Sequence, residues 1–260
     1  MNQAQRRIYL IKSLLAEQRR YENITIPQGK NEQEQFLRSL MNVRPPQPAS
    51  DDFLAVQDEY LRQRTAEKGI VKLQELTPVG NNLFLWQGDI TRLAADAIVN
   101  AANSGMTGCY YPCHGCIDNA IHTFAGVQLR LECAELMKRQ RHGEPAGRAK
   151  ITKAYNLPSK YVLHTVGLIV TAALSRKDET ELSDCYRSCL ALAKQSPIES
   201  IAFCCISTGE FHFPNERAAE IAVQTVKDDL QKSKIKVVFN VFKDEDYRIY
   251  QRLLGADKKA

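Results

Sequence analysis

The stretch "GCYYPCHGCIDNAIH", residues 108–122, gathers side chains that bind metals or carry out redox chemistry. Within eight residues it has three cysteines and one histidine, namely Cys109, Cys113, His114 and Cys116. Thiolates and imidazoles are ligands that Zn²⁺ takes in proteins. Cys113 and Cys116 also have the C-x-x-C spacing of a redox pair, but the flanking sequence does not match the thioredoxin-type unit in which such a pair opens a helix. The chemistry of the stretch therefore favours a metal site.

The shortness of this loop limits how many of its side chains can bind one ion. A closed set of four ligands would place the adjacent residues Cys113 and His114 on the same metal, which strains the chain. Three ligands are easier to satisfy. The residues alone leave open which three would bind.

Polar residues also follow predicted strands elsewhere. The carboxylate of Asp89, in "QGDIT", would accept a hydrogen bond from the amine of a base, or cap the following turn. Asn100 and Asn103, in "VNAAN", have amides that suit the vicinal hydroxyls of a ribose, or form a turn. Residues 207–209, in "ISTGEFHFP", precede a predicted helix, where backbone N–H groups and the helix dipole attract phosphate.

From about residue 70 the hydrophobic pattern alternates between strands and amphipathic helices. Strands are expected in "NNLFLWQGDI", "AADAIVNAAN", "AKITKAYNLPS", "KYVLHTVGLIV", "ESIAFCCISTG" and "KIKVVFNVF". Helices are expected over 116–139 with a break near Gly126, and over 178–196, 214–233 and 244–255. This order predicts an α/β fold of three layers, with helices on both faces of a mixed sheet. Ligands of such folds bind outside the carboxyl ends of the strands, where the polar loops lie.

Residues 1–70 are predicted to form an extension of three helices before an α/β body over 71–260. The second helix, in "NEQEQFLRSLMNV", ends before the breaker "RPPQP". The third has Ser50 or Asp51 as N-cap and Gly69 as stop signal. The apolar stripes of these helices require a surface to pack on, which we expect to be the body.

Composition argues against several other classes of function. The chain has 260 residues, 44% of them hydrophobic, and no run of about 18 apolar residues that would span a membrane. Its net charge of +5 is spread along the sequence, so no nucleic-acid partner is expected. Lys12 interrupts the apolar N-terminal stretch, which favours an amphipathic helix over a signal peptide. We therefore expect a cytoplasmic location and cysteines that are free thiols. Four cysteines in apolar or helical runs are interpreted as core residues: Cys185, Cys189, Cys204 and Cys205.

The motifs "QGDIT", "DAIVNAAN", "IDNAIH" and "CISTGEFHFP", in this order, resemble those of a macrodomain, an α/β/α module that binds ADP-ribose. The resemblance covers roughly residues 70–255. Common macrodomains have a glycine-rich loop where this chain has "GCYYPCHGC". In that departure, and in its helical extension, the sequence is similar to the zinc-containing macrodomains of microbial protein-ADP-ribose hydrolases.

This resemblance implies a zinc-dependent hydrolase that removes mono-ADP-ribose from modified protein side chains, and a module that only binds ADP-ribose is the alternative. Cys109, His114 and Cys116 are the implied Zn²⁺ ligands, leaving the open position that is typical of catalytic zinc. The implied substrate-binding residues are Asp89, Ile90, Asn103, Ile117, Asp118, Asn119, Ser207, Thr208, Gly209, Glu210 and Phe211. The implied partners are ADP-ribose and mono-ADP-ribosylated proteins. Family context adds a lipoyl-carrier protein modified by a sirtuin-like transferase.

The same resemblance gives catalytic roles to Asp118 and Asn103. Asp118 would activate water, with capping of its helix as the rival role, and Asn103 would orient the distal ribose. Zn²⁺ would act as a Lewis acid. His122, one helical turn after Asp118, either orients that carboxylate or fills the core.

Overall fold

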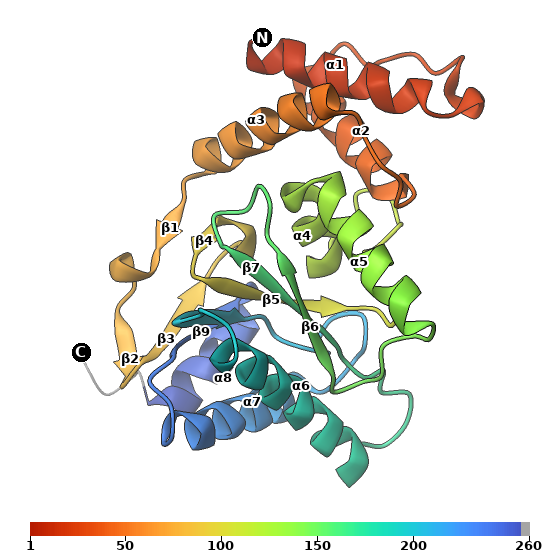
Figure 1. Ribbon diagram of the computed structural model, residues 1–260. Helices are drawn as coiled ribbons and strands as arrows, with labels where there is room; N and C mark the ends of the chain where they lie inside the picture. Colours follow the sequence, from red (N-terminus) through yellow and green to blue (C-terminus); the bar gives the residue numbers. More distant parts are fainter. Residues whose placement is uncertain (256–260) are drawn as a thin grey trace.

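The computed structural model describes residues 1–255, and a mixed sheet of seven strands lies at its centre (Figure 1). The strands follow the order β2-β3-β9-β8-β5-β7-β6, in which β2 and β6 at the two edges are antiparallel to their neighbours. Their bounds are β2 Pro78–Gly80, β3 Leu83–Gln87, β5 Ala97–Ala102, β6 Ala149–Lys153, β7 Tyr161–Val166, β8 Ser200–Phe203 and β9 Lys236–Val241. The five inner strands run parallel, so their carboxyl ends meet at one edge of the sheet.

Helices cover both faces of this sheet (Figure 1). On one face lie α4 (Ile117–Ala125) and α5 (Val127–Gln140), and on the other α6 (Arg176–Lys194), α7 (Asn215–Leu230) and α8 (Asp244–Leu254). The inner strands are buried on both sides, as β5 and β8 show with runs such as "AIV" and "SIAF". The three-layer α/β/α arrangement predicted from the alternation is confirmed.

The first helices, α1 (Gln3–Ala16), α2 (Lys30–Val43) and α3 (Asp51–Lys68), form a separate group beside α4 and α5 (Figure 1). Their buried residues make a hydrophobic cluster of their own, which Val127 of α5 joins. The side chain of Ser50 caps α3 by accepting from the N–H of Phe53, as the sequence predicted. α2 and α3 both contact α4, so the group is docked on the body, but its apolar stripes pack mainly on one another and not on the body as expected.

A break at Gly126 separates α4 from α5, as predicted, because its φ of +98° is costly for any other residue. Other expectations need correction. Short strands β1 (Val71–Lys72) and β4 (Leu93–Ala94) pair in parallel, and neither they nor β2 were predicted, since two or three residues show no periodicity. β8 ends at Phe203 because the chain turns there, and Cys205 is half-buried rather than buried.

Two helix boundaries also differ. α6 begins two residues earlier than expected because Ser175 forms a capping box with Asp178. α7 begins at Asn215, with Pro214 as its N-cap residue near the first turn as expected, and it ends at Leu230 rather than at residue 233. Within residues 1–255, no helix is both apolar enough and long enough to cross a bilayer.

Candidate active site

The loops that the sequence singled out emerge from the same edge of the sheet. Asp89 follows β3, Asn103 follows β5 and the segment 204–211 follows β8. β5 and β8 are neighbours, whereas β3 lies on the far side of β9. The parallel register therefore brings the loops after β5 and β8 together and places Asp89 farther along the edge.

Cys109, His114 and Cys116 converge in the loop between β5 and α4. Their ligand atoms, Sγ or a ring nitrogen, all lie within 4.8 Å of one another, and all three residues are half-buried. Within this group, Cys109 Sγ and His114 Nδ1 are 3.7 Å apart. Cys113 is exposed, and its thiol faces the carbonyl oxygen of Gln35 at 3.3 Å, outside this group. The three ligands implied by the resemblance are thus the three that the fold brings together.

The backbone of this loop is shaped by residues with positive φ. Gly108 has φ +84°, and a Cβ there would lie 2.8 Å from Cγ of His122, so only glycine fits. Cys113 has φ +54°, which is uncommon outside glycine. Cys116 ends the loop as the N-cap of α4, with its Sγ accepting from the N–H of Asn119 at 3.5 Å. One candidate ligand is therefore fixed by the start of the helix.

Asp118 is buried in the first turn of α4, and two asparagine side chains hold its carboxylate. Asn100 Nδ2 donates to Oδ1 at 2.8 Å, and Asn103 Nδ2 donates to Oδ2 at 3.2 Å. Because Cys116 is the cap residue, the capping role that rivalled catalysis for Asp118 is not the one observed. Burial raises the pKa of Asp118 to about 6, although the amide of Asn100 and the charge of Arg130 lower it in part.

The other predicted residues of α4 have different surroundings. Ile117 is half-buried at the helix start, whereas Asn119 is fully buried. The side chain of Asn119 donates to the carbonyl oxygen of Tyr111 at 3.0 Å and accepts from Arg38 at 2.7 Å. Asn119 therefore holds the loop, and its side chain is not free for a ligand.

Asp89 caps a short 3₁₀ helix, Ile90–Arg92, so the simpler interpretation of this residue is confirmed. Its Oδ1 accepts from Thr91, and its Oδ2 lies 3.1 Å from Nζ of Lys68 at the end of α3. Burial raises the pKa of Asp89, but the hydrogen bonds from Thr91 and the charge of Lys68 outweigh it and leave the pKa lowered. Ile90 beside it is buried.

The loop after β8 exposes backbone donors. Ser207 has φ +66°, and its Oγ accepts from the N–H of Leu168 at 3.1 Å, which fixes the loop from β7. Within residues 1–255, the N–H groups of Thr208, Gly209 and Glu210 make no hydrogen bond. Successive free N–H groups form a concavity that binds anions. Phe211 is half-buried, and its carbonyl oxygen accepts from Val170.

A contact joins this loop to the cysteine-rich loop. Nε2 of His114 lies 3.6 Å from a carboxylate oxygen of Glu210. The candidate metal ligands and the candidate phosphate loop are therefore in contact with each other.

A second group of metal-ligating types was missed from the sequence. His122, Cys133 and His164 come from α4, α5 and β7, are all buried, and have ligand atoms within 4.8 Å of one another. His164 is already bonded, to Asn100 at 3.1 Å and to Thr152 at 2.9 Å. Burial lowers the pKa of His164 to about 3, and burial, His164 and Arg130 lower that of His122. His122 is buried in this cluster, and its Nε2 also lies 3.5 Å from Oδ1 of Asp118, so it fills the core and stands beside that carboxylate.

Comparison with known proteins identifies the family of this fold. The Macro domain family model matches residues 99–222. A protein named protein-ADP-ribose hydrolase from Treponema medium is 56% identical over 98% of this chain and 100% of its own length. One of the same name from Staphylococcus aureus is 48% identical over 96% of this chain and 95% of its own. The Trypanosoma brucei macrodomain solved in complex with ADP-ribose is 31% identical with a TM-score of 0.65, covering 84% of this chain and 95% of that one. We conclude that this chain belongs to the macrodomain family.

Proposed function

We propose that this protein is a hydrolase that releases mono-ADP-ribose from modified protein side chains, with Zn²⁺ bound by Cys109, His114 and Cys116. The names of the Treponema and Staphylococcus relatives support the release of ADP-ribose from proteins. The observation that supports a bound Zn²⁺ is the convergence of three ligand atoms, all within 4.8 Å of one another.

These side chains fit Zn²⁺. Tetrahedral zinc with Zn–S of about 2.3 Å and Zn–N of about 2.1 Å separates sulfur from nitrogen by about 3.6 Å. Cys109 Sγ and His114 Nδ1 are 3.7 Å apart. Three protein ligands leave one position open, and there Zn²⁺ would supply a Lewis acid or a more acidic water.

The chain's own groups supply the remaining roles. Asp118 has a carboxylate whose raised pKa of about 6 suits a general base near neutral pH. Asn103 holds that carboxylate and stands beside the ligand loop, where an amide orients ribose hydroxyls.

Substrate binding is assigned to the loops after β3 and β8. The free N–H groups of Thr208, Gly209 and Glu210 support pyrophosphate binding. Asp89, with Ile90 beside it, is the acceptor assigned to the adenine amine. Because Lys68 already donates to Oδ2 of Asp89, the amine must either share this carboxylate with Lys68 or displace it. Asp89 stays ionised at neutral pH because its pKa is lowered.

The test is metal analysis together with an ADP-ribose release assay on one preparation. We expect one Zn²⁺ per chain and release that stops with a chelator and returns with added Zn²⁺. A lipoyl-carrier protein modified by a sirtuin-like transferase is the first substrate to offer, beside a generic mono-ADP-ribosylated protein.

Matched cysteine variants locate the metal. Cys109→Ser and Cys116→Ser should lose Zn²⁺ and activity, whereas Cys113→Ser, which changes the exposed thiol of the same loop, should keep both. ADP-ribose binding that survives chelation, with no release from any substrate, would leave the binding module as the function. Loss of activity in Cys113→Ser with Zn²⁺ retained would point to redox chemistry.

A further inference from the structure

We propose that α2 is part of the metal site, and that Arg38 is a positioning residue that holds the loop 108–116 in the conformation in which its ligands converge. The identity of the ion as Zn²⁺ rests on the proposed function, whereas the role of Arg38 in holding the loop rests on the hydrogen bonds between α2, α4 and residues 108–116.

The guanidinium of Arg38 reaches from α2 across to the loop and to α4. Its Nε and Nη2 donate to Oδ1 of Asn119 at 3.1 and 2.7 Å. The same Nη2 donates to the backbone carbonyl of His114 at 2.9 Å. One planar guanidinium thus binds the backbone of a candidate ligand and the side chain of Asn119 in the first turn of α4, a geometry that a lysine cannot reproduce.

Asn119 passes this contact to the rest of the loop. Its Nδ2 donates to the carbonyl of Tyr111, and its backbone N–H donates to the Sγ of Cys116. Arg38 fixes the orientation of the Asn119 amide, because an arginine can only donate and so requires the oxygen to face it. Through Asn119, Arg38 therefore holds Tyr111 in the middle of the loop and Cys116 at its end.

A second side chain of α2 repeats the arrangement one turn later. Oδ1 of Asn42 accepts from the backbone N–H of Cys113 at 2.9 Å, and its Nδ2 donates to Thr123 of α4 at 3.0 Å. Cys113 is the residue with φ +54°, so Asn42 stabilises the strained turn next to His114.

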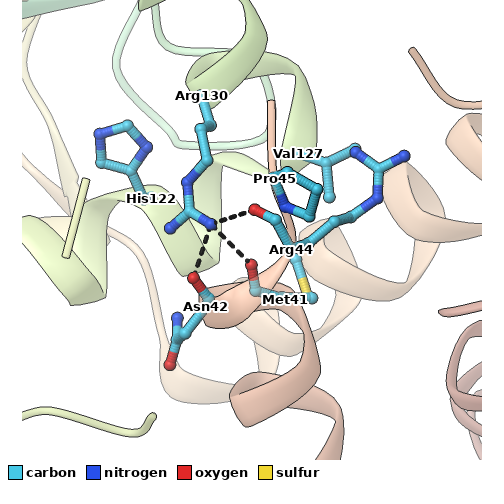
Figure 2. A pocket seen from close by; sticks show the side chains of 8 residues that line it. Met41, Asn42, Arg44, Pro45, His122, Val127 and Arg130 are labelled. Carbon is cyan, nitrogen blue, oxygen red and sulfur yellow. Dashed lines mark hydrogen bonds between the residues drawn. The ribbon is translucent and has the colours of Figure 1, made fainter. Parts of the chain in front are cut away.

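The end of α2 is itself anchored on the body by Arg130 of α5 (Figure 2). Nη1 of Arg130 donates to the carbonyls of Met41, Asn42 and Arg44, at 3.2, 2.6 and 2.6 Å. These carbonyls lie at or just beyond the C-terminal turn of the helix, where partners within the helix run out. Nη2 of Arg130 also donates to the carbonyl of Cys109 at 3.4 Å. The other end of the loop is thus tied to the same assembly.

This fastening matters because the loop has no regular secondary structure and is open to solvent. Tyr111 at its middle is 70% exposed. An unsupported loop of this kind must be ordered before it can bind an ion, and that cost lowers affinity. Arg38 and Asn42 order the loop in advance.

The experiment compares Arg38→Met and Arg38→Lys with wild type and with Arg64→Met. Arg64 is a matched control, because it is a half-buried arginine of the same helical group that contacts Glu34 and not the loop. Zn²⁺ affinity is measured by competition with a chromogenic chelator, ADP-ribose affinity by calorimetry, and exchange of the amides of residues 108–116 by mass spectrometry on metal-free protein.

We expect Zn²⁺ to bind about 10- to 100-fold more weakly to Arg38→Met, the range for lost partners of metal ligands. Arg38→Lys should restore little of this. Amide exchange across the loop should become faster, while ADP-ribose affinity and the thermal midpoint stay close to those of Arg64→Met.

The outcomes separate this proposal from the proposed function. Absence of Zn²⁺ binding in the wild-type protein would refute the metal assignment. Amide exchange of residues 108–116 that is the same in Arg38→Met and in wild type would refute the role of Arg38 in ordering the loop. Unchanged Zn²⁺ affinity in a folded Arg38→Met protein overturns the positioning role even if the hydrolase is confirmed. Full recovery in Arg38→Lys would overturn the need for a planar fork.

Discussion

Nε2 of His114 lies 3.6 Å from a carboxylate oxygen of Glu210, and this contact joins the loop after β5 to the loop after β8. Nδ1 of the same imidazole faces Cys109 at 3.7 Å. An ion bound at Nδ1 therefore leaves the Nε2 proton to Glu210. A carboxylate in this position orients a ligating histidine and raises its basicity.

Glu210→Gln is the first test of this relationship. We expect Zn²⁺ affinity to fall about 10-fold, the lower end for such partners, because Glu210 is largely exposed. Chelator competition measures the loss. Glu220→Gln, which changes an exposed glutamate on α7 that pairs with Arg217, should leave the affinity unchanged. Equal affinities for both variants would make the contact incidental.

Asp118→Asn tests the proposed base. Removal of a general base should slow ADP-ribose release by about 10²- to 10⁴-fold, with ADP-ribose affinity nearly unchanged. Single-turnover release and calorimetry measure the two quantities. The variant also leaves one of the two asparagine donors facing an amide N–H₂ group, so the thermal midpoint is measured as well, and the rates are compared at a temperature where both proteins are folded. Release at the wild-type rate would exclude Asp118 as the base.

Gly108→Ala tests the shape of the loop. Its φ of +84° and the 2.8 Å approach of a Cβ to His122 should lower the free energy of unfolding by roughly 1–3 kcal/mol. Weaker Zn²⁺ binding should accompany this loss. Gly115→Ala is a control in the same loop, since a Cβ there meets no atom within 4 Å. Denaturant unfolding compares the two, and equal stabilities would contradict the steric argument.

The buried histidines predict acid sensitivity of the fold. Burial lowers the folded-state pKa of His164 to about 3, so below the unfolded-state value of about 6.5 the unfolded chain binds the proton more readily. The contribution of neutral His164 to the free energy of unfolding is fully present above the unfolded-state pKa, and it is lost as the pH falls below that pKa. From pH 7 to pH 5 the free energy of unfolding should decrease by about 2 kcal/mol through His164 alone. His122 adds to this decrease, and Asp118, with its raised pKa, opposes it by about 1 kcal/mol.

Urea unfolding at the two pH values measures this difference. His142→Gln, which changes an exposed histidine, should show the same decrease as wild type. An imidazole resonance of His164 that titrates near pH 6.5 in the folded protein would contradict the prediction.

The order of strands and helices after residue 70 could be predicted because buried parallel strands and amphipathic helices have distinct periodicities. The three candidate ligands could be chosen only through resemblance, since spacing alone did not separate Cys113 from Cys109 and Cys116. Arg38, Asn42 and their partners were missed because their contacts join residues 71–81 positions apart, and no local pattern marks such pairs. A separation of 21 positions likewise hid the contact of Lys68 with Asp89.

Arg130 has a consequence for how this architecture can change. Three of its acceptors are backbone carbonyls at the end of α2, and its side chain is buried. A shortened chain lacking the first three helices would lose these acceptors and open the Arg130 guanidinium to water, because residues 41–45 cover it on that side. In such a chain Arg130 would still reach the carbonyl of Cys109, but it would no longer join that end of the loop to the helical extension.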